Sequence, residues 1–247
     1  MFTGRIWLHE QEYRSMTPKA AKEYFTWFKE NIPNELDFLQ KMTSSSVVLD
    51  FTPESLKVLE DWFIPMRKYV ELSEKQILED YAGAPEFILQ DALQTRYAPT
   101  VGTADLGARI AIYFGEVFVR NDPDLYWDYV KKPKTDVSFN VPAIFGFSPP
   151  NMKYQDSADT FKWGMPMYSD SAKGLNWKKT WYELYQIRKN LKELYWSPDY
   201  SIEKHMQYMD EWQERDKKEG KLKEGEIIIM PGSMIRLNEA ITKRINK

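Results

Sequence analysis

The segment from residue 103 to residue 120 constrains the fold more than any other part of the sequence. Its apolar side chains recur at the spacing of one helical face: Leu106, Ile110, Tyr113, Phe114 and Val117. Three more lie off that face: Ile112, Phe118 and Val119. A helix that is apolar around most of its circumference must be covered by other elements. The density of β-branched and aromatic residues would also suit a strand over 110–119, but the length of the pattern favours a central helix over 104–120.

Helix starts on the N-terminal side of this segment share one signal. Thr17-Pro18 and Thr52-Pro53 each combine a capping hydroxyl with a proline in the first turn, where its missing N–H is harmless. The first of these helices should end near Pro33, because a proline ring inside a helix clashes with the preceding turn. A second helical pattern is then expected to run up to the serine-rich loop that precedes residue 47.

Other helices are expected on both sides of the central one. Ser73 and Gln76 have the spacing of a capping box, in which each side chain binds the other residue's backbone N–H. Amphipathic patterns over 176–195 and 201–218 predict two helices near the C-terminus.

Strand signals are short and sparse. Residues 47–49 are β-branched or apolar and end at an aspartate, and residues 226–230 form a similar run stopped by Pro-Gly. The ranges 126–130 and 137–141, separated by a polar turn, predict a hairpin, and 144–147 could extend it after a bulge.

These patterns predict an α+β fold, predominantly helical, with a small antiparallel sheet packed against the central helix. Residues 1–147 should form the α+β core. Residues 148–174 read as a long irregular connection, and residues 175–247 as a helical region that either completes the same domain or forms a second one.

Composition removes several classes of chemistry. The chain has no cysteine and only two histidines, His9 and His205. A disulfide framework, a thiolate nucleophile and a cysteine or multi-histidine metal centre are therefore excluded, so we expect no metal and no cofactor, although a carboxylate metal site stays open. The 34 basic and 37 acidic residues nearly balance, which argues against a nucleic-acid partner.

Motif and targeting signals are also missing from the sequence. The phosphate-binding, dinucleotide-binding, serine-hydrolase and zinc-protease motifs do not occur. Nor does the sequence contain a secretory signal or a long apolar span, so a cytoplasmic location without membrane contact is expected.

Glu116 is the first candidate catalytic residue, because a carboxylate in apolar surroundings needs a partner or a raised pKa. Arg120 lies one turn later, Arg109 lies two turns earlier, and Arg96 could approach from another helix. The plainer interpretation is a structural ion pair among these four residues; the alternative is catalysis or partner recognition.

Asp50 is the second candidate catalytic residue. It stands at a predicted strand end before a helix, where α/β enzymes often place acids. Its plainer role is to bind the amides that open the helix at Pro53. The sequence leaves both roles open.

Aromatic residues divide into two groups. Those on helical stripes are expected in the core: Trp27, Phe63, Trp177 and Trp181. Those in predicted strands or loops are the candidates for an exposed binding surface: Trp127, Trp163, Tyr168 and Trp196.

Several short motifs carry a resemblance to a known group of proteins. They are Asp50 to Leu56, Trp62-Phe63, Ile112 to Val119, Tyr126-Trp127-x-Tyr129, Lys132-Pro133-Lys134, Asn140-x-Pro142 and Gly146-Phe147. With them, roughly over residues 17–147, the chain resembles an uncharacterised family of bacterial, mainly Gram-positive, cytoplasmic proteins. The resemblance implies a location but no particular activity. Families of similar size and gene setting suggest, by analogy, an immunity or antitoxin-type protein.

The leading functional hypothesis is therefore a non-enzymatic cytoplasmic module that binds another protein, in the manner of an immunity protein. The alternative is a carboxylate-dependent hydrolase or transferase that uses Glu116 and Asp50. The sequence sets no oligomeric state.

Overall fold

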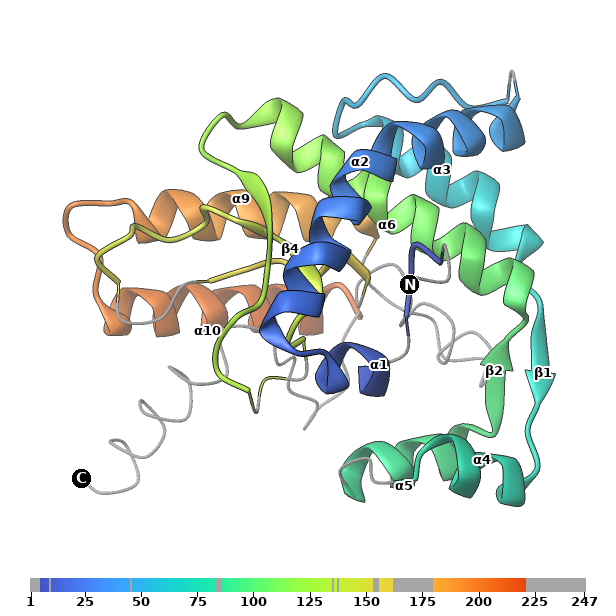
Figure 1. Ribbon diagram of the computed structural model, residues 1–247. Coiled ribbons are helices and arrows are strands. Elements are labelled where there is room, and N and C mark those ends of the chain that lie inside the picture. The colour runs from blue at the N-terminus through green and yellow to red at the C-terminus, as the bar shows by residue number, and fades with distance from the viewer. Residues whose placement is uncertain are drawn as a thin grey trace.

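The protein has the predominantly helical α+β fold that the sequence predicts, with two small antiparallel sheets where one was predicted (Figure 1). The structure, a computed structural model, describes residues 5–8, 10–44, 46–82, 86–134, 136, 138–152, 156–161 and 180–220. Its helices are α1 (Glu10–Ser15), α2 (Pro18–Thr43), α3 (Ser55–Phe63), the short 3₁₀ helix η1 (Ile64–Met66), α4 (Glu74–Asp80), α5 (Glu86–Thr95), α6 (Val101–Asn121), α9 (Trp181–Tyr195) and α10 (Ile202–Lys218). Its strands are β1 (Tyr69–Glu71), β2 (Tyr97–Pro99), β3 (Tyr126–Tyr129) and β4 (Pro142–Phe145).

Helix α6 is the central element, and the prediction of a helix in this segment is confirmed. The Thr100 hydroxyl caps it by accepting a hydrogen bond from the N–H of Thr103. Every residue from Ile110 to Gly115 is buried. Helices α2 and α3, sheet β3–β4 and helix α9 supply the surrounding core side chains.

Helix α2 does not end at Pro33, so that prediction is wrong. The helix runs through the proline to Thr43. Its buried face continues across this point from Phe28 and Ile32 to Leu39, all packed in the main core. Burial of those side chains outweighs the roughly 3 kcal/mol that an interior proline costs.

The β3–β4 sheet uses a different second strand from the one predicted. Strand β3 pairs with Pro142–Phe145, in the register Trp127 opposite Ile144. Of the predicted second strand, Asn140 and Val141 bond to Val130, while the N–H groups of Phe139 and Val141 donate to the carbonyls of Asp136 and Ser138 and form turns. Asn140 adopts a left-handed φ of 66° there, and its side-chain amide donates to the carbonyl of Tyr13 at 2.9 Å.

Residues 47–49 alternate as a strand would, with Val47 and Leu49 buried and Val48 exposed. They pair with neither sheet among the residues that the structure describes. The predicted strand at 226–230 lies outside those residues.

Helix α9 joins the main core. Thr180 and Glu183 form a capping box at the start of α9. Trp181 then stacks on Phe63 with ring centroids 5.9 Å apart, and Tyr185 stacks on Phe118 at 4.8 Å. Helix α10 packs on the far end of α9 in a second apolar cluster: Ile187, Leu191, Tyr195, Met209 and Trp212. No helix in the described part of the chain is both long enough and apolar enough to span a bilayer.

Candidate protein-binding surface

Residues 64–100, which we call the arm, leave the body between α3 and α6. Strands β1 and β2 form a two-stranded ribbon, and α4 and α5 form a helical hairpin at its end, away from the rest of the fold (Figure 1). Two hydrogen bonds hold the root of the arm. The N–H of Thr100 donates to the carbonyl of Lys68 at 2.9 Å, and the N–H of Lys68 donates to the hydroxyl of Thr103 at 3.0 Å.

The local structure of the arm follows from its sequence. The predicted capping box of Ser73 and Gln76 is present and starts α4. Ile77 is fully buried where α4 meets α5. A ribbon of two three-residue strands is marginal alone, and here Tyr69 is partly buried against the main core. The arm therefore depends on its root for stability.

Exposed apolar side chains concentrate on the arm. Of the twelve large apolar residues that are exposed in the described part of the chain, half lie on it or at its junction with α6: Ile64, Met66, Val70, Leu78, Tyr97 and Val101. Val101 is the most exposed of all, at 79%. Single exposed apolar residues are normal on a protein surface, but a concentration on one projecting element is typical of an interaction site.

The arm was missed by sequence reasoning. Its strands are only three residues long, too short for an alternating pattern. Exposure of Val70 and Tyr97 is a property of the projecting shape, and residue type alone does not reveal it. The capping box at Ser73 and the amphipathic pattern after residue 85 identify two helices without showing that they leave the body.

Glu116 sits in a structural network. Its carboxylate accepts hydrogen bonds from the guanidinium of Arg120 at 3.1 Å and from the indole N–H of Trp127 at 2.9 Å. The Trp127 ring lies directly on Gly115, where an added Cβ would approach the indole to 2.1 Å. Glycine therefore gives the indole room to reach the neighbouring glutamate.

The other two arginines proposed as partners of Glu116 bind elsewhere. Arg109 pairs with Glu35 on α2 at 2.8 Å and lies over the Phe38 ring. Arg96 is on the arm, and its guanidinium donates to the carbonyl of Leu93. Of the four residues in the proposed ion-pair group, the structure thus brings together Glu116 and Arg120.

Asp50 is exposed and binds the turn that precedes α3. One carboxylate oxygen accepts from the N–H of Thr52 at 2.9 Å and from its hydroxyl at 2.7 Å, and these bonds lower the pKa of the Asp50 carboxyl. The next residue, Phe51, has a left-handed φ of 62°; its N–H donates to the Tyr113 hydroxyl, and Arg120 lies over its ring. Asp50 therefore shapes a turn attached to α6.

The four aromatic binding candidates separate clearly. Trp127 is 8% exposed and belongs to the main core, so its assignment to an exposed surface is wrong. The reason is the space above Gly115, which admits the whole indole. Trp196 is 46% exposed at the end of α9, with Lys192 over its ring. Trp163 and Tyr168 lie outside the described residues.

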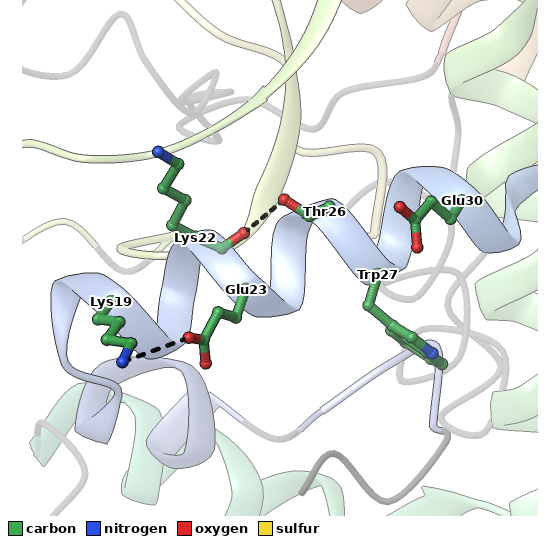
Figure 2. A pocket seen from close by; sticks show the side chains of 6 residues that line it. All are labelled: Lys19, Lys22, Glu23, Thr26, Trp27 and Glu30. Atoms are coloured by element: carbon green, nitrogen blue, oxygen red, sulfur yellow. Dashed lines mark hydrogen bonds and ion pairs between the residues drawn. The ribbon is translucent and has the colours of Figure 1, made fainter.

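Trp27 was assigned to the core, yet it is only partly buried. It lines a shallow hollow of about 470 Å³ along α2 (Figure 2). The hollow is built from one stripe of that helix: Lys19, Lys22, Glu23, Thr26, Trp27 and Glu30. Lys19 pairs with Glu23 at 3.9 Å, and the Thr26 hydroxyl donates to the carbonyl of Lys22. These two contacts stay within the helix, and the labelled side chains point in different directions and do not converge on one ligand.

Glu60 is a buried acid just before the arm. It is 5% exposed, and its Oε2 accepts a hydrogen bond at 3.0 Å from the N–H of Trp181, the first residue of α9. Burial raises the pKa of the Glu60 carboxyl from 4.5 to about 7, although the hydrogen bond acts in the opposite direction. Glu60 therefore joins α3 to α9 and titrates inside the core. Across the described residues, no group of three or more His, Asp or Glu side chains could hold a metal ion.

Comparisons with models of protein families, with curated protein sequences and with solved structures gave no match for this chain. The resemblance to a bacterial family stays a prediction. Function has to be inferred from the arrangement of the chain's own residues.

Proposed function

We propose that this protein is a non-enzymatic cytoplasmic module that binds another protein, and that the arm makes the contact. The observation that carries the proposal is the concentration of exposed apolar side chains on one projecting element. Aromatic and apolar residues in the centre of an interface supply most of its binding energy. An immunity-type protein, which acts by binding a toxin, is the form of such a module that we favour.

The geometry gives the enzyme alternative no comparable support. The Glu116 carboxylate is engaged by Arg120 and Trp127, and Asp50 is engaged by Thr52. A general acid or base has to lie within hydrogen-bond reach of a substrate. The hollow on α2 contains neither of the two carboxylates.

Site-specific photo-crosslinking in cells of the native host tests the proposal. A photoreactive phenylalanine analogue replaces Leu78 or Tyr97 on the arm in the full-length protein. Phe38 on α2, which has similar exposure, supplies the control position. We expect the two arm positions to crosslink to the same protein and the Phe38 position to give no such product.

Two results would contradict the proposal. One is equal crosslinking to many proteins from all three positions, which would indicate random collision. The other is a single product formed only from Phe38, which would move the contact from the arm to the body.

A further inference from the structure

Negative charge is concentrated on the helical hairpin of the arm. Residues 74–95 carry five acids and one base, Lys75, which gives a formal charge of −4. The whole chain has a formal charge of −3, so all the remaining residues together sum to +1. The whole arm, residues 64–100, has six acids and four bases and a formal charge of −2, so the negative charge of the arm lies in the hairpin.

Glu74, Glu79, Asp80 and Glu86 of the hairpin are exposed, and they have little compensation by cationic side chains. Glu74, Asp80 and Glu86 are exposed, and none has a cationic partner among the described residues. Lys75 reaches Glu79 at 3.8 Å, in a pair whose side chains are both mostly exposed. Such a pair is weak and screened. The hairpin consequently presents an uncompensated negative field next to exposed Leu78.

Two of these acids oppose local stability. Glu79 and Asp80 form the last two residues of α4, and the last turn of this helix contains no basic residue. The carbonyl groups at a helix C-terminus carry partial negative charge, so acids there cost about 0.3–1 kcal/mol each. Glu86, in the first turn of α5, is at the favourable end. The pair with Lys75 offsets part of this cost at Glu79, whereas Asp80 has no such pair. Helix stability thus explains Glu86 but not Asp80, which suits a role in recognition.

We propose that the arm docks on a cationic protein surface, in which lysine or arginine side chains surround an apolar centre. This inference rests on the proposed function and specifies the partner's chemistry. Exposed Leu78 and Tyr97 would meet the apolar centre, and the exposed acids of the hairpin would meet the surrounding cations. The same acids repel nucleic-acid phosphates and anionic lipids. A symmetric contact with a second copy would oppose two hairpins of −4 each.

Fluorescence anisotropy with a defined probe tests the inference. The probe is a labelled 18-residue amphipathic helix of leucine and lysine, and its matched control has glutamate in place of every lysine. The purified full-length protein is titrated into each peptide. We expect the lysine peptide to bind, more weakly as salt rises from about 50 to 300 mM, and the glutamate peptide not to bind.

Matched variants locate the binding. The arm variant is E79K/D80K/E86K, and the body variant is E23K/E30K/D37K, which changes three exposed acids of α2 and shifts the net charge equally. We expect the arm variant to weaken binding of the lysine peptide at least about tenfold and the body variant less than about twofold. Circular dichroism confirms that each variant is folded.

Truncation of the apolar centre gives a second measurement. L78S/Y97S should also weaken binding of the lysine peptide. This loss of affinity should persist at about 300 mM salt, because apolar contact is not screened by ions.

Three outcomes would overturn the inference. The first is the absence of binding by the lysine peptide, and the second is equal weakening by the arm and body variants, which would indicate net charge alone. The third is a salt-resistant dimer in sedimentation equilibrium that L78S/Y97S dissociates, which would place a second copy on the arm. Crosslinking from Leu78 and Tyr97 to a protein without a cationic surface would leave the proposed function standing and refute only this inference.

Discussion

Replacing Glu60 by glutamine should make the protein more stable at pH 8 while leaving it nearly unchanged at pH 4.5. The folded protein holds a proton on Glu60 up to about pH 7, whereas the unfolded chain releases it near pH 4.5. Between these values the folded state binds more protons than the unfolded state. The free energy of unfolding therefore falls as pH rises through this window, and the loss is complete above about pH 7.

The magnitude follows from the shift in pKa. A rise from 4.5 to about 7 corresponds to about 3 kcal/mol at pH 8, at about 1.4 kcal/mol per pH unit. Glutamine keeps an oxygen that accepts the N–H of Trp181 at the start of α9 and removes the buried charge. E60Q should accordingly gain up to about 3 kcal/mol over the parent at pH 8, or roughly 6–12 °C in Tm for a chain of this size.

Urea unfolding followed by tryptophan fluorescence, at half-unit steps from pH 4.5 to pH 8, measures this difference. E54Q is the control, because Glu54 is an exposed acid at the start of the same helix. Its stability should run parallel to that of the parent at every pH. The reasoning is refuted if E60Q also runs parallel to the parent, or if it is the less stable protein at pH 8.

Three further substitutions and one control substitution test the packing. Gly115→Ala should destabilise the protein by about 2–3 kcal/mol in urea unfolding, because the added methyl group would overlap the rigid Trp127 ring. Gly102→Ala on the same helix is the control. Its added Cβ meets nothing within 4 Å, so this substitution should be neutral or stabilise the protein by up to about 1 kcal/mol. Pro33→Ala should raise Tm, since it restores a hydrogen bond inside α2; a lower Tm would mean that the packing requires the proline. Arg188 on α9 and Asp156 form a buried ion pair at 2.7 Å. Arg188→Met should destabilise the protein by about 3–5 kcal/mol, because it leaves the Asp156 carboxylate buried without its partner, and a loss below about 1 kcal/mol would contradict that reasoning.

The sequence anticipated the helices better than the sheets, and the reason is the range of the interactions. Caps such as those at Thr17 and Ser73 act within three or four residues, so local sequence reveals them. Pairing of β3 with residues 142–145 depends on the left-handed turn at Asn140, which side-chain alternation does not encode. The passage of α2 through Pro33 depends on burial against distant residues.

The candidate site was less predictable for the same reason. A glutamate between apolar residues marked Glu116 as unusual, but its role was decided by an indole from another element that fits over Gly115. Trp127 could not be assigned to the core until that space was known. The arm is recognised only from its placement, because exposure of Leu78 and Tyr97 is defined by what the rest of the chain leaves uncovered.

The root of the arm has an evolutionary consequence. Because Thr100 and Lys68 are joined by a backbone hydrogen bond, the chain leaves and re-enters the body at adjacent points. A segment whose two ends meet can be lengthened, shortened or exchanged with little disturbance to its host. Relatives of this protein could therefore keep the same body while the sequence and length of the arm change. An arm transplanted from one relative to another should transfer the donor's binding specificity.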